Sequence, residues 1–204
     1  MKWTRAVHHL ETLASTCADM ATRPVSIFPR RVGELWAAGE ILGPIAEIEL
    51  ITVALTVDLP AEAVPWRTEP SGARHWANAA RLPQSPVRPF WRSAHAPVWN
   101  HELYRPVLVW SEADGVRTDV LAAIADGEGE SVRPAAPTPA DLRARVADEL
   151  AISLRGLRER SAEYEERRWK PGKLEPVADA LWQVGAGYLD LLDAEDRAAG
   201  NTFR

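Results

Sequence analysis

The chain has 204 residues and a formal net charge of −5, which is enough length for one domain of ordinary size with a full core. Its single cysteine, Cys17, excludes an intrachain disulfide framework and a cysteine metal site, and the mild, interspersed charge gives no global signal for nucleic acid or an anionic membrane. No apolar run approaches the length of a membrane span, and the first residues do not resemble a signal peptide. We therefore expect a cytoplasmic protein that has no membrane partner. Nucleic acid is an unlikely partner.

The first part of the chain predicts a helix followed by two strands. Apolar residues recur at steps of three and four over residues 2–21, which is typical of an amphipathic helix. Residues 32–60 predict a hairpin-like pair of strands around a turn at Gly43 and Pro44. In the second strand, over residues 48–57, both sets of alternating positions are largely apolar, which indicates a central strand covered on both sides.

The middle of the chain predicts short helices and more strands. One or two short helices are expected in residues 61–84, and residues 106–111 form a clear β run. Four prolines, at positions 86, 89, 97 and 106, predict edge strands or loops in the stretch before this β run. A helix over residues 116–126 is closed by Gly127. Together these elements predict an α+β body over residues 1–128, with a small mixed or antiparallel sheet flanked by helices.

The last third predicts a linker and a pair of helices. Residues 129–138 have few large apolar side chains, as linkers do. Thr138 is then expected as an N-cap, with Pro139 in the first turn and Asp141 completing the start signal.

Two apolar stripes at near-heptad spacing follow, in residues 142–164 and 177–191. Since a short loop joins antiparallel neighbours, residues 139–204 are predicted to form an antiparallel two-helix hairpin packed on the body.

The segment AAGEILGPIAEIELITV contains the first candidate site. Gly39 follows a predicted strand, and Glu47 and Glu49 stand two apart at the expected start of the next one. Carboxylates two residues apart on a strand face the same side and can share a divalent metal. The other interpretation is that the two glutamates flank a turn at the exposed end of the strand.

This segment resembles the nucleotidyltransferase superfamily, in which a strand-borne Gly-Ser pair is followed by two acids around an apolar residue. The order helix, strand, strand and the trailing helices are also similar to that superfamily. An active enzyme of this kind would use Glu47 and Glu49 as ligands of Mg²⁺ in a two-metal transfer. The sequence departs from the pattern because Glu40 stands where a small polar residue should approach phosphates, and because the later β run holds no third acid.

The segment SAHAPVWNH contains the second candidate site. His95, Trp99, Asn100 and His101 place two imidazoles, an indole and an amide in one proline-shaped loop. Such a loop can bind a small ligand by hydrogen bonding and stacking, or the same side chains can cap and fill the loop. No cysteine or paired acid stands near the two histidines in the sequence, so no metal site is indicated.

Much of the sequence, above all VHHLETLA, SAHAPVWN and YEERRWKPGKLEPVADALW, resembles an uncharacterised family of conserved hypothetical proteins from actinobacteria. That likeness covers nearly the whole chain and implies one cytoplasmic unit without a known activity. The leading hypothesis is therefore a non-catalytic or repurposed nucleotidyltransferase-like protein that binds a small molecule or a protein partner between its body and the hairpin, with Gly39 and Glu40 as further ligand contacts. Two alternatives are an active metal-dependent nucleotidyltransferase and an interaction protein whose apolar stripes pair with another chain; the oligomeric state is left open.

Overall fold

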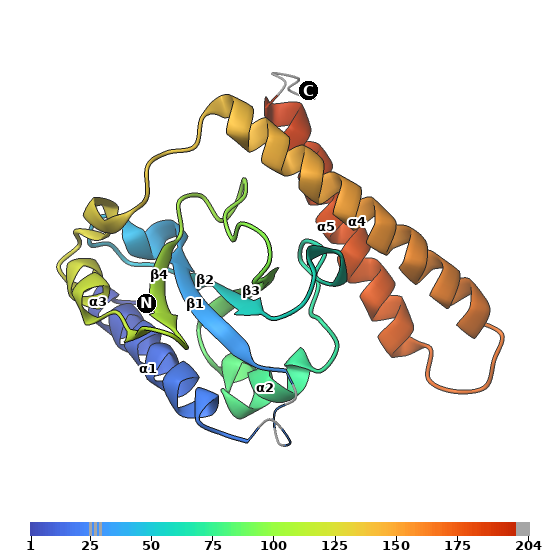
Figure 1. Ribbon diagram of the computed structural model, residues 1–204, viewed down its shortest axis with the longest axis horizontal. Coiled ribbons are helices and arrows are strands. Elements are labelled where there is room, and N and C mark those ends of the chain that lie inside the picture. Colours follow the sequence, from blue (N-terminus) through green and yellow to red (C-terminus); the bar gives the residue numbers. More distant parts are fainter. Residues whose placement is uncertain (25, 27, 29, 199–204) are drawn as a thin grey trace.

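The computed structural model describes residues 1–24, 26, 28 and 30–198, and it shows a five-stranded mixed sheet with helices on both sides (Figure 1). The strands are β1 (Val32–Ala38), β2 (Ile51–Val57), β3 (Val87–Ser93), β4 (Val107–Ser111) and β5 (Gly115–Val116). The α-helices are α1 (Trp3–Ala21), α2 (Ala73–Ala79), α3 (Thr118–Ala125), α4 (Pro139–Arg167) and α5 (Glu175–Ala198). Four 3-10 turns accompany them: η1 (Gly39–Leu42), η2 (Ala61–Ala63), η3 (Leu82–Gln84) and η4 (Gly129–Val132). The predicted α+β class with a small mixed sheet is confirmed.

The strands are arranged in the order β3-β2-β1-β4-β5. β1 pairs antiparallel with β2, as the hairpin-like prediction required, and it also pairs antiparallel with β4. β3 runs parallel to β2, because the chain crosses over through α2 before it returns to the sheet. Pro89 has no N–H to donate to a ladder, and β3, which contains it, lies at an edge of the sheet; this confirms the expectation drawn from the prolines.

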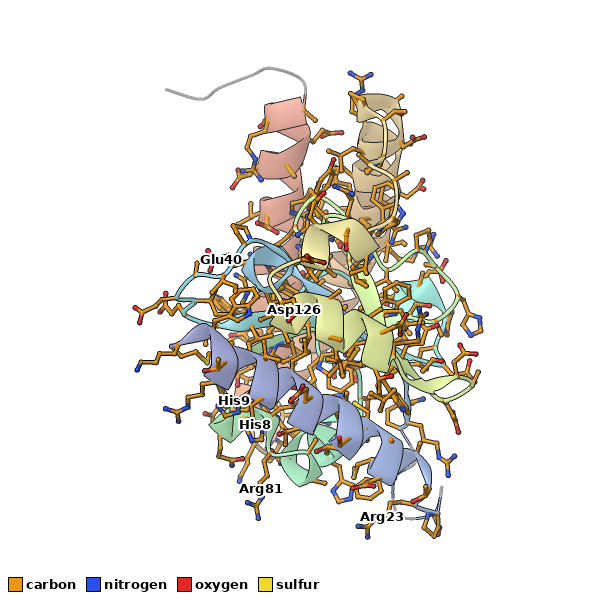
Figure 2. The ribbon with its side chains drawn as sticks, turned by 90° about the vertical axis from the view of Figure 1, so that its left-hand side faces the viewer. His8, His9, Arg23, Glu40, Arg81 and Asp126 are labelled. Carbon is orange, nitrogen blue, oxygen red and sulfur yellow. The ribbon has the colours of Figure 1, made fainter. Side chains whose placement is uncertain are left out.

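One face of the sheet is apolar and covered by α1, α2 and α3. The side chains of β2 that point to this face are at most 1% exposed, and they are Ile51, Val53, Leu55 and Val57. Figure 2 looks onto this side, where α1 crosses the molecule with α3 above it. Cys17 is buried on α1, as predicted, and burial raises the pKa of its thiol. This face is the main hydrophobic core.

The two C-terminal helices pack together on the opposite side of the sheet from α1 (Figure 1). The predicted capping box begins α4: the Thr138 hydroxyl accepts from the Asp141 amide at 3.1 Å, and the Asp141 carboxylate accepts from the Thr138 amide at 2.9 Å. The predicted apolar stripes are covered within the chain in part, most completely at Val146, Val184 and Leu191. The end of the predicted hairpin, residues 199–204, lies outside the described part.

The stripe predicted for α4 includes Val146, which is buried, and Leu150, which packs against the body, but it misses the polar residues that are buried on the same helix. Ser161 on that stripe is exposed, whereas Arg145, Glu149 and Ser153 are buried. Polar side chains can face the interior when partners satisfy them, and hydrophobic spacing gives no sign of that. On α5, Trp182 is 73% exposed, so part of the apolar surface of this helix is uncovered.

The predicted linker is attached to the body at several points. Gly129 in η4 lies so close to Leu42 that a Cβ would fall 2.8 Å from the Leu42 Cα. The Arg133 guanidinium donates to the carbonyl oxygen of Gly39 at 3.1 Å. No helix among the described residues has the length and apolar character needed to cross a membrane.

Candidate ligand-binding cavity

The second face of the sheet is partly polar, and it faces α4 and α5. Glu34 of β1, Thr56 of β2 and Arg92 of β3 are neighbours across three strands on this face. Two residues further along β1, and therefore on the same face, Trp36 is paired with Ala54 of β2. Because successive side chains of a strand point to opposite faces, these polar residues lie on one face of the sheet and the apolar core lies on the other.

A buried cluster of charges joins this face to α4. Arg92 and Glu149 form an ion pair whose side chains are each 4% exposed. Arg145, one helical turn before Glu149, pairs with the same carboxylate at 2.8 Å. Burial lowers the pKa of the Arg145 guanidinium, and the neighbouring charge of Glu149 opposes that shift. The carboxylate between two guanidinium groups compensates charges that would be costly to bury alone.

The segment SAHAPVWNH is shaped by Asn100 and tied to the same cluster. The Asn100 side-chain oxygen accepts from the amides of Glu102 at 3.0 Å and Leu103 at 2.8 Å, which fixes a turn, and its amide nitrogen donates to Glu149 at 3.0 Å. Both guanidinium groups of the cluster also donate to the Pro97 carbonyl oxygen. The loop is therefore held in one conformation by buried hydrogen bonds.

Trp66 connects the sheet to α5. Its ring is 1% exposed and stacks on Phe90 of β3, with ring centroids 4.7 Å apart. Its indole nitrogen donates to Asp190 of α5 at 2.6 Å, and the His101 Nε2 lies 3.0 Å from the same carboxylate. Burial by itself would raise the pKa of Asp190, but these hydrogen bonds and the charge of Arg67 outweigh it and lower the pKa to about 2.

A cavity of about 790 Å³ lies between four parts of the chain. They are β1, the loop that follows β3, the predicted linker (residues 129–138) and the first turns of α4. Its walls combine the indole rings of Trp36 and Trp99 with prolines, alanines and a few charged groups. The lining residues are Glu34, Trp36, Ala94, Ala96, Pro97, Val98, Trp99, Arg105, Pro106, Pro134, Ala135, Pro137, Asp141, Ala144, Arg145 and Asp148. A volume of this size and an apolar wall with few polar groups are typical of small-molecule sites.

Arg105 holds the outer wall of the cavity in place. It has a left-handed backbone, with φ of 51°, which is unfavourable for a residue with a long side chain. From this position its guanidinium donates to the Pro134 carbonyl oxygen at 2.7 Å and pairs with Glu130 at 2.5 Å. The contact fastens the predicted linker to the body beside the cavity, and Pro134, Ala135 and Pro137 of this segment form part of the cavity wall.

The four residues of the second candidate site go to different places. Trp99 lines the cavity, while Asn100 is buried beneath it in the loop. His101 packs under α5 against Asp190. The His95 ring lies at the surface, 2.7 Å from the exposed carboxylate of Asp58. Of the four, only the indole is in a position to touch a ligand in the cavity.

The first candidate site is at the surface. Glu47 and Glu49 are both exposed, and the prediction that they begin a strand is wrong because β2 begins at Ile51. The residue between them, Ile48, is buried, and its amide donates to the Met1 carbonyl oxygen at 3.1 Å. This contact holds the segment away from the sheet ladder, so the two carboxylates are not placed by strand geometry.

Gly39 and Glu40 lie in η1, at the end of β1. Gly39 has a positive φ of 72°, and Glu40 is exposed at the surface (Figure 2). Neither residue lines the cavity. Among the residues that the structure describes, the two glutamates Glu47 and Glu49 gather no third histidine, cysteine or acid into a metal-binding group.

One group in the described part of the chain has the spacing of metal ligands. Atoms of His101, Glu102 and Asp190 lie within 4.8 Å of one another. The two carboxylates already have cationic partners, because Arg67 lies 3.4 Å from Asp190 and 3.2 Å from Glu102, and Arg88 lies 2.8 Å from Glu102. A divalent ion would have to displace these guanidinium groups, so the geometry favours a polar contact between the body and α5.

A protein-family model described as a domain of unknown function, DUF7711, matches residues 1–197. The chain belongs to the DUF7711 family. The match includes the sheet, the wall formed by residues 129–138 and both C-terminal helices, so every element that lines the cavity falls within the DUF7711 unit. No curated protein and no solved structure matches the chain.

Sequence reasoning missed most of the residues that build this site. Glu34 and Trp36 stand two apart on β1 and flank a buried leucine, a pattern that could have marked one polar face of the strand. Arg145 and Glu149 have the i, i+4 spacing of an ordinary surface ion pair on a helix, so nothing in the sequence indicates that they are buried. Asp190 meets His101 across 89 residues, a distance over which no motif is visible.

Proposed function

We propose that this chain is a non-catalytic, nucleotidyltransferase-like protein that binds a small molecule in the cavity between its sheet and α4. The nucleotidyltransferase-like part is supported by the order α1, β1, β2 and by the mixed sheet. The binding part rests on one observation: a cavity of about 790 Å³ with two half-buried indole rings in its walls.

The construction of the walls supports a binding role. A cavity in a flexible region would close on itself, whereas these walls are fastened by buried ion pairs at Glu149 and by the contact of Arg105 with Pro134. A site that is formed before its ligand arrives spends little of the binding free energy on ordering the protein. The concave shape also favours a small molecule over the flat surface of a protein partner.

A matched pair of substitutions on α4 tests the proposal. Ala144 lines the cavity and Ala147 is exposed on the same helix outside it. A fragment library with cationic, neutral and anionic members is screened by ligand-observed NMR against the wild-type chain, Ala144→Trp and Ala147→Trp. We expect hits that bind the wild type and Ala147→Trp and are lost in Ala144→Trp, because the indole fills the cavity. Absence of hits, or hits that bind all three chains equally, would refute a site in this cavity.

The non-catalytic part has its own test. The chain is incubated with each nucleoside triphosphate and Mg²⁺, and release of pyrophosphate or nucleotide transfer is followed. We expect no turnover, because Glu47 and Glu49 are exposed at the surface and are joined by no third metal-binding residue within the described chain. Turnover in the wild type that is lost in Glu47→Gln and Glu49→Gln would establish the active enzyme instead.

A further inference from the structure

The arginines of the cavity are already paired. Arg105 is bound to Glu130 and to the Pro134 carbonyl oxygen. Arg145 pairs with Glu149 and donates to the carbonyl oxygens of two loop residues, at 2.8 and 3.2 Å. Since these guanidinium groups have charged and neutral acceptors of their own, they offer little positive charge to a ligand.

The carboxylates of the cavity differ from its arginines in their contacts. Within the part of the chain that the structure describes, neither Glu34 nor Asp148 forms an ion pair. The third acid in the lining, Asp141, is engaged in the capping box of α4. The charge that remains available to a ligand is therefore negative.

An indole ring stands beside one of these carboxylates. The Trp36 indole nitrogen donates to the Glu34 carboxylate at 2.9 Å, which fixes both groups on the face of β1. Trp99 supplies a second half-buried indole from the loop. Indole faces attract cations, and the attraction is strongest where water is displaced. Prolines and alanines form the rest of the wall and suit an apolar group.

From this juxtaposition we infer that the ligand is an organic cation, with an amine or quaternary ammonium group attached to an apolar body. The cationic group lies beside the Glu34 carboxylate and against the face of an indole ring, and the apolar body lies against the prolines. This inference rests on the proposed function, because it names the class of ligand for the same cavity.

Three isosteric probes separate charge from shape: naphthylethylamine, naphthylethanol and naphthylacetate. Each is titrated by isothermal calorimetry into the wild type, Glu34→Gln and Glu195→Gln. Gln keeps an acceptor for Trp36 while removing the charge, and Glu195 is an exposed acid of α5 outside the cavity. We expect the amine to bind the wild type about tenfold more tightly than the alcohol, and to lose about that factor in Glu34→Gln but not in Glu195→Gln. The alcohol should bind all three chains equally.

Two results would overturn the inference and leave the cavity proposal standing. The first is an alcohol or acetate that binds as tightly as the amine. The second is a fragment screen whose hits, abolished by Ala144→Trp, are neutral or anionic. If the probes and the screen both give no binding, the inference and the proposed function fail together. Circular dichroism of each variant confirms that the chain is folded.

Discussion

The two faces of the sheet are stabilised in different ways. Toward α1, alternate residues of β2 are apolar and nearly fully buried, from Ile51 to Val57. Toward α4 and α5, the same sheet presents Glu34, which accepts a hydrogen bond from Trp36 of the same strand, and Arg92, which pairs with Glu149 of α4. Apolar packing is non-directional and fills the space available, whereas hydrogen-bonded charges fix particular distances and can hold a cavity open. The first face therefore forms the apolar core, and the second combines buried charges with a cavity.

The largest effect is expected from removal of the shared carboxylate on the polar face. Glu149→Ala leaves Arg92 and Arg145 buried without their counter-ion, and we expect the free energy of unfolding to fall by about 3–5 kcal/mol. Urea denaturation followed by circular dichroism measures it.

A surface pair on the same helix is the matched control. Arg160 and Glu163 lie 2.6 Å apart with both side chains about half exposed, so Glu163→Ala should cost less than about 1 kcal/mol. Equal effects of Glu149→Ala and Glu163→Ala would show that the buried cluster does not hold α4 to the sheet.

Two neighbours on β2 test the contrast between the faces directly. Leu55 points into the apolar core, and Leu55→Ala should destabilise the chain by about 2–5 kcal/mol because it removes buried apolar volume and leaves a cavity. Thr56 points to the polar face, and its buried hydroxyl has no hydrogen-bond partner within the described residues. Thr56→Val should therefore be neutral or stabilising. The urea midpoints of both variants measure these changes in stability. If Thr56→Val destabilised the chain as much as Leu55→Ala, the two faces would not differ in the way described.

The apolar half of the molecule could be predicted from the sequence because buried helix and strand faces place apolar residues at regular spacings. The steps of three and four in residues 2–21 gave α1, and the two apolar faces of residues 48–57 gave a central strand. The capping box at Thr138 and Asp141 was also visible, since capping depends on residues that are near in sequence.

The polar half could not be predicted in the same way. The contacts of Arg92 with Glu149 and of Trp66 with Asp190 join residues 57 and 124 positions apart. Nothing local distinguishes a buried glutamate on a helix from an exposed one. The pair Glu47 and Glu49 shows the opposite error, because a local pattern suggested a site where the contact of Ile48 with Met1 keeps both carboxylates at the surface.

Close packing of α5 on the segment after η2 gives the next prediction. A Cβ on Gly187 would lie 2.9 Å from the carbonyl carbon of Trp66 and closer still to its oxygen, so Gly187→Ala should push α5 away and cost about 3 kcal/mol. Gly185 is the control, since a Cβ there meets nothing nearer than a Leu157 methyl at 3.9 Å. Because alanine favours a helix, Gly185→Ala should stabilise the chain by up to about 1 kcal/mol. Thermal unfolding of the two variants should shift in opposite directions. A Gly187→Ala variant as stable as the wild type would mean that α5 lies farther from Trp66.

The smallest effect concerns the charge of Asp190 on the same contact. Its pKa is lowered from an ordinary 3.8 to about 2, so its contribution to stability is complete above pH 4 and is lost as the pH falls through 2. With a carboxylate that is 20% exposed, screening reduces this contribution to about 1–2 kcal/mol.

Asp190→Asn keeps an acceptor for Trp66 and His101 but does not titrate, so the difference in unfolding free energy between wild type and variant should shrink steadily from pH 4 to pH 2. Urea denaturation at intervals across this range measures the difference and removes the contribution of the other carboxylates, which both chains share. A difference that is constant with pH would mean that Asp190 has the same pKa in the folded and unfolded chain. The polar face would then depend at this point on the shape of the contact and not on its charge.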